Sequence, residues 1–505
     1  MEILIRRADL ATRPVDVLAV GVAEGVPARG GFAARLDVAS RGALKTLRAS
    51  GDFAARPGDM ALIYPAGVKA KRVLLVGLGG LGGPGPAGEL DERRVLLAAA
   101  AAARRARELG ATTLALALSE RVERSPALLR AAGEGVLLGH HRYTAYVAGG
   151  GKAPLKRVEL LSGTAPTAAG RAAVSAGVTR GEAVGLARDL ASTPGQDLPP
   201  MALAERAREV AKRVGARVTV HDPAAMERLG MGCVLAVGRG SPNPPCFIEL
   251  VKEPSGAKRG AKVKTVVVIG KGVTFDTGGV SLKPREGMSK MKYDMSGSAA
   301  VVGLFASLDA LELPFRLVGL IPSAENVTDG RAIKPGDIVR AMDGTTIEVT
   351  NTDAEGRLLL ADALVHARRF MPVAVVDLAT LTGAMSIALG RHAAGLFTTD
   401  DALAAELHAA GEASGERLWR MPLWPEFLSE MRGEVSDLVN SNERREGGSC
   451  TAAAFLSHFA KGLPWAHLDI ASTAWTYTDR PDAARGPNAF GVRLLVEWLE
   501  RRARA

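Results

Sequence analysis

The sequence predicts an α/β protein of two domains, because the chain is long and because strand-like and helix-like segments alternate along it. At 505 residues it is too long for one simple core. We expect a smaller N-terminal α/β domain at 1–165, a linking helix at 166–190 and a larger C-terminal domain at 191–505. The larger domain is expected to have a central mixed sheet flanked by helices.

The N-terminal half is typical of a small sheet with helices. One helix is predicted from Asp91 to Leu109, since acidic residues open it and Gly110 stops it. A stretch with Gly and Pro at Gly149–Pro154 is predicted to precede a second helical run at Ala165–Leu190. The strands predicted in this half are Ile3–Ile5, Val17–Val22, Val73–Val76 and Leu114–Leu118.

The C-terminal half repeats this alternation on a larger scale. Helical runs fall between most of its apolar segments, as in a mixed or parallel sheet covered by helices. The buried strands predicted here are Val218–Val220, Val234–Val237, Val266–Ile269, Phe315–Ile321, Ile347–Thr350, Val373–Val376 and His467–Ile470.

Cysteine usage and hydropathy restrict the class of protein. Cys233, Cys246 and Cys450 lie far apart without a C-x-x-C pair. This spacing argues against a disulfide framework or a thiolate zinc site and fits a reducing compartment. The N-terminus has no long apolar segment, and no run of about eighteen apolar residues occurs, so no membrane span is predicted. We therefore expect a soluble cytoplasmic protein.

The formal net charge of +10 leaves two interpretations open. A basic surface attracts nucleic acid or acidic partners. The densest basic cluster, Lys252–Lys264, contains Gly and Pro and lies between two strand-like runs. A solvated hairpin loop is therefore favoured over a binding patch.

Two segments about sixty residues apart gather the side chains that a hydrolytic metal site needs. The first, GKGVTFDTGGVSLKPREGMSKMKYD, runs from Gly270 to Asp294, and the second, NTDAEGRL, runs from Asn351 to Leu358. Each follows a predicted strand, and ligands in open α/β sheets bind beyond the carboxyl ends of strands. Converging carboxylates repel one another unless divalent cations join them. The charged residues are Lys271, Asp276, Lys283, Asp294, Asp353, Glu355 and Arg357.

Simpler explanations exist for some of these residues. Asp353 is a suitable N-cap for the helix that follows it, and Glu355 and Arg357 are an ordinary charge pair for a first helical turn. Asp276 and Asp294, however, lie among apolar and glycine residues, where an unpaired carboxylate is costly to bury. Taken together, the two segments favour metal binding.

Both segments resemble the cytosolic leucyl aminopeptidases, a family that removes N-terminal residues from peptides with two metal ions. NTDAEGRL is a signature of that family, and a GKG-TFD-GG-S-K-M-KYDM stretch precedes it. The resemblance covers about residues 185–505. Its other segments are GMGCVLAVGRGSPNPP (Gly230–Pro245), PGDIVRAMDG (Pro335–Gly344), SGERLWRMPLW (Ser414–Trp424) and PWAHLDIASTAW (Pro464–Trp475).

The resemblance implies a ligand set for two divalent ions, Mn or Zn. Asp276 and Glu355 match the residues that bridge both ions, while Lys271 and Asp294 complete one site and Asp353 the other. Lys271 would bind through a neutral amine, whose pKa burial and two cations would lower. A hydroxide held between the ions would then attack the peptide carbonyl.

Other matching residues would act on the substrate. Lys283 would be a cation near the scissile carbonyl, although a lysine before a proline is also common on surfaces. Arg357 would hold a bicarbonate ion that acts as general base. The residues that match the pocket for the first side chain are Met291, Thr380 and Gly383, with the Leu381 backbone at the amine end. Small departures occur at Ser289 and Ser298, which are not ligand positions.

The family further implies peptide substrates with a free N-terminus, a broad preference for Leu and a homohexamer. An alternative function remains open, because some bacterial relatives also bind DNA as regulators, and the N-terminal domain has no assigned role. A metallophosphatase also uses bridged metals, but it normally recruits histidines or phosphate-binding loops, which we do not find.

Three further motifs favour structural roles. The G-x-G-x-x-G match at Gly77–Gly82 is followed by prolines rather than by a helix, so it predicts a glycine-rich loop. His467 and Asp469 share a strand face without a G-x-S-x-G elbow, which favours a structural hydrogen bond. Cys450 begins a helix without an identifiable partner histidine, so we expect it to be packed.

Overall fold

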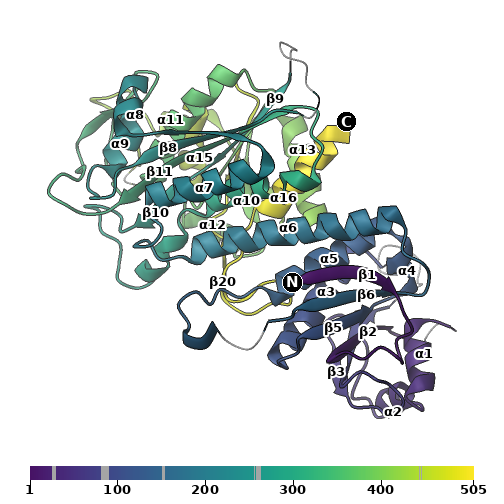
Figure 1. The fold of residues 1–505 in the computed structure, drawn as a ribbon. Helices are drawn as coiled ribbons and strands as arrows, with labels where there is room; N and C mark the ends of the chain where they lie inside the picture. The colour runs from purple at the N-terminus through teal and green to yellow at the C-terminus, as the bar shows by residue number, and fades with distance from the viewer. Residues whose placement is uncertain are drawn as a thin grey trace. The chain divides into compact units, whose positions relative to one another are not determined.

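The computed structural model describes two compact units (Figure 1). The first consists of Met1–Gly185 and Thr478–Arg485, and the second of Leu186–Tyr477 and Gly486–Ala505. Helix α6 (Ala168–Ser192) lies where the linking helix is predicted. The domain boundaries at 165 and 190 stay a prediction. The described residues are 1–25, 30–80, 90–150, 154–254, 256, 263–442, 444 and 446–504.

The first unit is built on a six-stranded sheet in the order β1-β6-β5-β2-β4-β3. All neighbours are parallel except the antiparallel pair β3–β4. Phe32 and Leu36 of α1 (Phe32–Ala39) and Leu44 of α2 (Ala43–Ala49) pack in the core formed with these strands. The strands are β1 (Glu2–Arg7), β2 (Val17–Ala23), β3 (Met60–Ile63), β4 (Val73–Gly79), β5 (Thr113–Ala117) and β6 (Arg157–Ser162).

The long helix of this unit confirms its predicted boundaries closely. Helix α3 (Glu92–Glu108) is capped by Asp91, whose side chain accepts from the backbone N–H of Arg94. It ends before Gly110, which has φ +70°. Helix α5 (Pro126–His140) packs along it. The predicted glycine-rich loop at Gly77–Gly82 lies partly outside the described residues, since positions 81–89 are not described.

The second unit contains a mixed nine-stranded sheet in the order β16-β15-β18-β14-β9-β11-β8-β7, with β10 paired to β11. The middle strands β18, β14, β9 and β11 are parallel, whereas β8 and β15 run antiparallel to their inner neighbours. The strands are β7 (Arg217–His221), β8 (Cys246–Lys252), β9 (Thr265–Gly270), β10 (Gly272–Asp276), β11 (Arg316–Asn326), β14 (Ala374–Ala379), β15 (Ala394–Phe397), β16 (Leu418–Arg420) and β18 (Trp465–Asp469).

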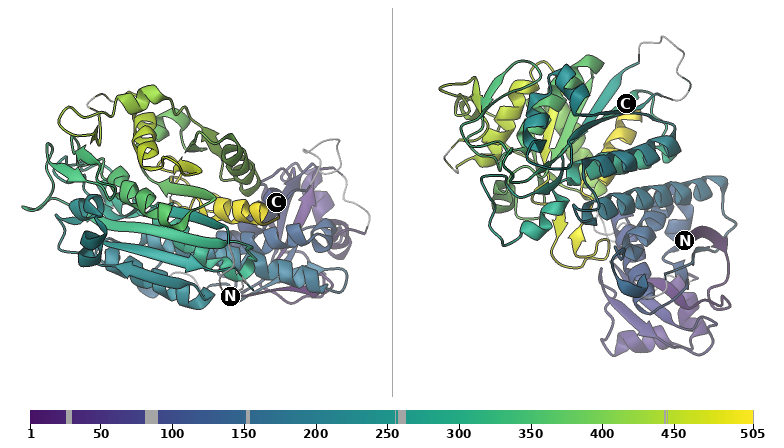
Figure 2. Two further views of the ribbon diagram at one scale, coloured as in Figure 1. Left: turned by 90° about the horizontal axis from the view of Figure 1, so that it is seen from above. Right: turned by 60° about the vertical axis from the view of Figure 1, so that its left-hand side comes forward.

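Helices cover both faces of this sheet (Figures 1 and 2). Val267 and Ile269 of β9 belong to the core shared with α9, α11 and α15, while α10 packs against the same strands. The prediction of a mixed sheet flanked by helices is therefore confirmed. The α-helices of this unit after α6 are α7 (Pro200–Val214), α8 (Pro223–Leu229), α9 (Gly232–Gly238), α10 (Ser296–Ala306), α11 (Gly356–Ala367), α12 (Ala384–Leu389), α13 (Asp401–Ser414), α14 (Pro425–Ser429), α15 (Gly448–Phe459) and α16 (Val492–Arg504).

The predicted strand Val234–Val237 is wrong, because this segment forms helix α9. A short apolar run does not by itself distinguish a buried strand from a buried helix. The backbone N–H groups of Cys233 and Val234 both donate to Asp362 Oδ2 at 3.0 Å. A buried carboxylate on α11 thus satisfies two amides in the first turn of α9, which have no acceptor within their own helix.

Two further features differ from the sequence prediction, one in the sheet that a strand joins and one in the connection between two strands. The predicted strand Ile347–Thr350 forms β13 (Thr346–Glu348), which belongs to a separate sheet with β12 (Ile338–Arg340) and β17 (Leu438–Val439). The predicted hairpin around Lys252–Lys264 is also wrong, because β8 and β9 each pair with β11, which lies between them. Positions 255 and 257–262 of that segment lie outside the described residues.

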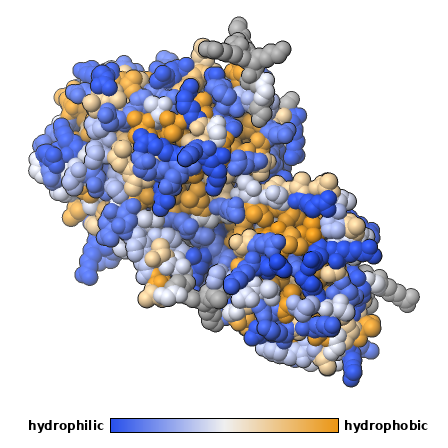
Figure 3. Space-filling view, in the orientation of Figure 1, coloured by the Kyte–Doolittle hydropathy of each residue, from blue (hydrophilic) through white to orange (hydrophobic). Residues whose placement is uncertain are grey.

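The described surface is mixed in character. On the face drawn in Figure 3, hydrophilic residues are spread widely, with hydrophobic areas between them. Such a mixture is usual for folded proteins. Among the residues that the structure describes, no helix combines the length and apolarity needed to cross a membrane.

Candidate metal centre

The two acidic segments meet on one side of the second unit. Strand β9 ends at Gly270 and β10 runs to Asp276, while the loop after β13 leads into α11, which begins at Gly356. One carboxylate oxygen from each of Asp276, Asp353 and Glu355 lies within 4.8 Å of the other two. Three acidic side chains from distant parts of the chain therefore share one centre.

Lys271 lies between two of the carboxylates. Its Nζ is 2.8 Å from Asp294 Oδ2 and 2.8 Å from Glu355 Oε1. It also donates to the backbone oxygen of Thr380 at 3.0 Å. The side chain is only 3% exposed, so this ammonium is held entirely by protein groups.

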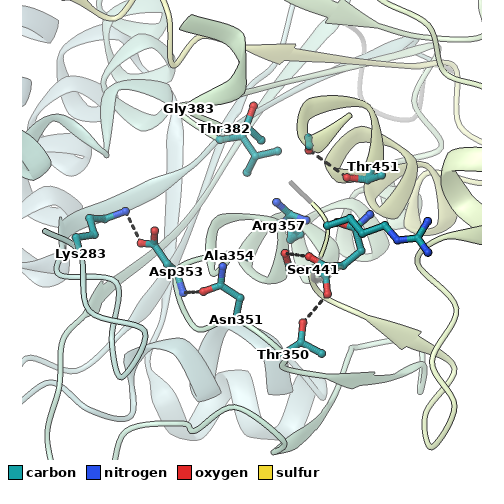
Figure 4. Close-up of a pocket in the computed structure, with 14 residues that line it drawn as sticks. Lys283, Thr350, Asn351, Asp353, Ala354, Arg357, Thr382, Gly383, Ser441 and Thr451 are labelled. Atoms are coloured by element: carbon teal, nitrogen blue, oxygen red, sulfur yellow. Dashed lines mark hydrogen bonds and ion pairs between the residues drawn. The ribbon is translucent and has the colours of Figure 1, made fainter. Parts of the chain in front are cut away.

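Lys283 supplies a second positive charge. Its Nζ lies 2.8 Å from Asp276 Oδ2 and forms another ion pair with Asp353, toward which it points in Figure 4. Asn326 Nδ2 donates to Asp276 Oδ1 at 2.9 Å and fixes that carboxylate. The acidic centre, as we call it below, consists of Lys271, Asp276, Lys283, Asp294, Asp353 and Glu355.

Glycines make this packing possible at two positions. A Cβ on Gly356 would lie 2.8 Å from Cε and Nζ of Lys271, so a larger residue would push the ammonium away. Gly278 has φ +88°, a conformation that favours glycine, and its N–H donates to Asp276 Oδ1 at 2.8 Å. A glycine in each segment is therefore required by the packing of the centre, one to leave space for Lys271 and one to bind Asp276.

Burial and mutual repulsion perturb the acidic groups. Burial, followed by repulsion from Asp276, raises the pKa of Glu355 to about 8. Burial is also the main cause that raises the pKa of Asp294 to about 6 and that of Asp353. For Lys271, burial opposes the charged form, but nearby carboxylates outweigh it and raise its pKa. The centre is thus short of positive charge even with two lysines present.

The side chains of the acidic centre fit divalent cations. Glu355 Oε2 is buried and has no hydrogen-bond partner, which leaves a ligand atom free. If all four carboxylates are ionised, the two ammonium groups leave two negative charges uncompensated. The chain's own carboxylates raise the pKa of Lys271, so the predicted lowering of this pKa depends on the cations.

A cavity of about 600 Å³ opens beside the acidic centre (Figure 4). Thr350 and Asn351 line it on the side of the second acidic segment, and Ser441 and Thr451 line it from later in the chain. The predicted site residues that line the cavity are Lys283, Asp353, Arg357, Leu381 and Gly383.

Arg357 brings a buried guanidinium to this cavity. Its Nη1 donates to the backbone oxygen of Asn440 at 2.7 Å, whereas its Nε has no hydrogen-bond partner. Burial lowers the pKa of Arg357 to about 10, so the group remains charged at neutral pH. A buried cation with unused donors beside a cavity is suited to hold a small anion.

Two predicted pocket residues lie outside the cavity lining. Thr380 instead donates through Oγ1 to Asp294 Oδ1 at 2.6 Å, which orients that carboxylate. Met291 lies in the turn η3 (Met288–Tyr293), three residues before Asp294. The structure thus brings the Thr380 side chain to the acidic centre, whereas Met291 contacts it through the backbone, since the N–H of Asp294 donates to the Met291 oxygen at 3.3 Å.

The sequence interpretation assigned no role in the site to three residues that position it. Asn326 binds Asp276, and Asn440 accepts from the N–H of Thr350 at 2.9 Å. Asp469 accepts from the N–H of Leu381 at 3.2 Å, so it holds the wall of the cavity. Asn326 and Asp469 end β11 and β18, and that position at strand ends was the available signal.

The motifs expected to be structural were found in structural contacts. His467 Nδ1 is bonded to Asp377 Oδ1 at 2.5 Å, so the expected hydrogen bond exists but with a different partner from Asp469. Cys450 is buried near the start of α15, as expected, and burial raises the pKa of its thiol.

The fold and the site together define a metal-dependent hydrolase, with buried carboxylates and lysines at strand ends beside a cavity. A family model described as the catalytic domain of the cytosol aminopeptidase family matches residues 185–496. The model for the N-terminal domain of the same family matches residues 19–148. The chain belongs to the cytosol aminopeptidase family and is a metal-dependent aminopeptidase.

Curated relatives match over most of their length. A probable cytosol aminopeptidase of Roseiflexus castenholzii is 47% identical over 457 residues, which cover 89% of this chain and 91% of the relative. A probable cytosol aminopeptidase of Geobacter sulfurreducens is 41% identical over 503 residues and covers 99% of both chains. The similarity therefore includes both units.

Solved structures agree with the fold. The bottromycin maturation enzyme BotP in complex with Mn has a TM-score of 0.83 and 40% identity, covering 97% of this chain and 100% of that one. A mutant of tomato leucine aminopeptidase has a TM-score of 0.86 and 31% identity, covering 99% and 96%. The predicted two-domain α/β fold and the predicted family are thus confirmed.

Proposed function

We propose that this aminopeptidase uses two divalent ions, Mn or Zn, held by the acidic centre. Asp276 and Glu355 would contact both ions, Lys271 and Asp294 would complete one site, and Asp353 would complete the other. The observation that carries this proposal is the convergence of Asp276, Asp353 and Glu355, together with the unpartnered Glu355 Oε2. Carboxylate and amine ligands accept several divalent metals, so Mn and Zn are both compatible.

The bound ions would supply Lewis acidity and generate a hydroxide nucleophile from water. Lys283 is placed to act on the substrate itself, because it lines the cavity and carries a charge that burial has not removed. We propose that it stabilises the negative charge that develops on the scissile carbonyl oxygen. Its pairs with Asp276 and Asp353 would hold it at the required place.

Arg357 is proposed to bind a bicarbonate ion that accepts and returns the proton of the attacking water. Its buried guanidinium offers charge and unused donors beside the cavity. A general base must lie within hydrogen-bond reach of the proton it moves, and Arg357 and Asp353 line the same cavity. A buffer depleted of bicarbonate should then lower turnover, and added bicarbonate should restore it.

A broad preference for Leu at the first residue is also proposed. Leu381 and Ala354 give the cavity an apolar portion, and the chain turns at Gly383, which adds no side chain. Met291 and Thr380 would contribute to the same pocket once substrate is bound. Apolar pockets discriminate by only about 1–3 kcal/mol per methylene, so other residues should also be accepted.

The assembly and location of the protein are proposals as well. We propose a homohexamer that acts in the cytoplasm on peptides with a free N-terminus. Trp419, Trp424 and Ile387 are large apolar side chains of the second unit that are 61%, 61% and 89% exposed, as expected for a surface covered by another subunit. Sedimentation of the purified protein measures its mass in solution and so tests the homohexamer. The mass of a monomer would contradict this proposal.

Replacement of one proposed ligand tests the function. Glu355→Ala should abolish hydrolysis of leucine amide, because it removes both an ion-bridging group and the free oxygen atom. Far-UV circular dichroism should remain as in wild type, which separates lost chemistry from lost folding. Exhaustive chelation should likewise remove the activity, and Mn or Zn should restore it. Wild-type turnover in either case would contradict the proposal.

A further inference from the structure

A second cluster of possible metal ligands lies in the second unit, apart from the acidic centre. His221 is the last residue of β7, Glu249 lies in β8 and His366 lies in the last turn of α11. One ligand atom from each lies within 4.8 Å of the other two. His366 is ten residues beyond Gly356, so about 15 Å of helix separates this cluster from the start of α11.

Strand register explains why these residues meet. His221 pairs with Phe247 in the antiparallel ladder of β7 and β8, and Glu249 lies two residues further along β8. Side chains two residues apart share a face of a sheet, so His221 and Glu249 point to the same side. The end of α11 covers that side, with the rings of Phe247 and His366 4.9 Å apart.

The hydrogen bonds within the cluster leave nitrogen atoms unused. His366 Nε2 lies 3.0 Å from Glu249 Oε2, so these two members are joined by a hydrogen bond. His221 Nε2 is buried and has no hydrogen-bond partner. An unpartnered imidazole nitrogen is costly to bury, but its lone pair is suited to a metal ion.

Arg369 is the group that would compete with a cation here. Its Nη1 lies 3.4 Å from His366 Nε2. The residue is exposed, so its guanidinium can move to solvent without leaving a buried charge. The carbonyl end of α11 carries a partial negative charge, which partly compensates for the nearby guanidinium.

We propose that His221, Glu249 and His366 form a structural zinc site. Two imidazoles and one carboxylate are a ligand set that Zn²⁺ prefers, and water would be the fourth ligand, since His221 is only partly buried. Zinc at this place fastens the end of α11 to β7, which is an edge strand of the sheet, and to its neighbour β8. The other end of α11 follows Glu355, so the site stabilises the helix on which the acidic centre depends.

The test uses zinc itself on full-length protein carrying Glu355→Gln, which weakens metal binding at the acidic centre. After metal removal and reloading, zinc content and zinc-edge X-ray absorption are measured with and without His221→Gln. The imidazole scattering signal reports this cluster, because the acidic centre contains no histidine and none of the residues that line the cavity beside it is a histidine. We expect one equivalent of zinc and the imidazole signal to be lost with His221→Gln.

Two further variants sharpen the result. His408→Gln removes an exposed histidine of α13 and should leave zinc content and the imidazole signal unchanged. Arg369→Ala should tighten zinc binding roughly tenfold, since a neighbouring positive charge is removed. Equal zinc content with and without His221→Gln, or no imidazole signal at all, would overturn the proposal and leave a hydrogen-bonded core pair. Because activity is not read, this outcome is independent of the proposed peptidase mechanism.

Discussion

Lys283 is the residue whose proposed role separates substrate chemistry from metal binding. It is 20% exposed, lines the cavity and lies between Asp276 and Asp353. Lys271 is almost fully buried and contacts only protein groups. The two lysines therefore have different environments, although both adjoin the same carboxylates.

Lys283→Met should lower kcat by roughly 10²–10³-fold, the usual loss when one charge-stabilising group is removed from a transition state. Steady-state kinetics with leucine amide measure this loss. Lys334→Met, at an exposed lysine paired with Asp337, is the matched control and should keep wild-type kinetics. A higher KM with an unchanged kcat would show instead that Lys283 binds the substrate in its ground state.

Glu355 should give the metal-free protein a characteristic pH dependence. Its pKa is raised from 4.5 in the unfolded chain to about 8 in the fold. The stability linked to it is therefore fully present below pH 4.5 and is lost as the pH rises through about 8. In chelator, Glu355→Gln should lose less thermal stability than wild type between pH 5 and pH 8. If wild type and Glu355→Gln had the same change in melting temperature between pH 5 and pH 8, the raised pKa of a buried Glu355 would be contradicted.

The carboxylates of the centre were predictable because acidic groups among glycines and apolar residues are conspicuous in sequence, whereas Lys271 and Lys283 were distinguished from other lysines only by the family resemblance. The asparagines that support the centre were not predictable, because Asn326 and Asn440 are distant from the residues they contact in the sequence and meet them only in the folded chain. The position of Asn326 at the end of β11 was the available signal, but one strand end among many does not by itself single out a residue. The ligand and substrate roles of the predicted residues stay predictions.

At the scale of elements, α9 and α11 depend on one buried carboxyl. Asp362 accepts from the N–H groups of Cys233 and Val234 and, through Oδ1, from that of Met342 at 2.8 Å. Burial raises its pKa to about 7. This side chain therefore joins the start of α9 and a nearby loop to the middle of α11.

Asp362→Ala should reduce the free energy of unfolding by about 1–3 kcal/mol or more, since buried N–H groups lose their acceptor. Urea denaturation measures the change. Asp309→Ala, on the turn η4 (Leu308–Ala310) and far along the chain, is a control that should change stability by less than about 0.5 kcal/mol. An unaltered midpoint for Asp362→Ala would show that water satisfies these amides.

Strand prediction succeeded where apolar runs were β-branched and flanked by turns, as in β9 with its sequence TVVVIG. It failed at α9, where the acceptor for the helix amides lies 129 residues away in sequence. It also placed β13 in the wrong sheet, because local pattern does not define the pairing partner. Long-range contacts decide both cases.

At the scale of the whole molecule, both units match one family along nearly the full chain. The comparisons give no support to the alternative of a DNA-binding regulator, and the densest basic segment lies largely outside the described residues. The formal charge of +10 alone does not specify a partner. Assembly into a hexamer would place the exposed apolar side chains of the second unit at contacts between copies.

The central claim is that one pair of cations occupies the acidic centre. Anomalous diffraction from crystals of the wild-type protein loaded with Mn²⁺ tests this most directly. We expect two peaks about 3.5–4 Å apart, both bordered by Asp276 and Glu355, with Asp353 at one and Asp294 at the other. A single peak, or peaks that none of these carboxylates contacts, would contradict the account.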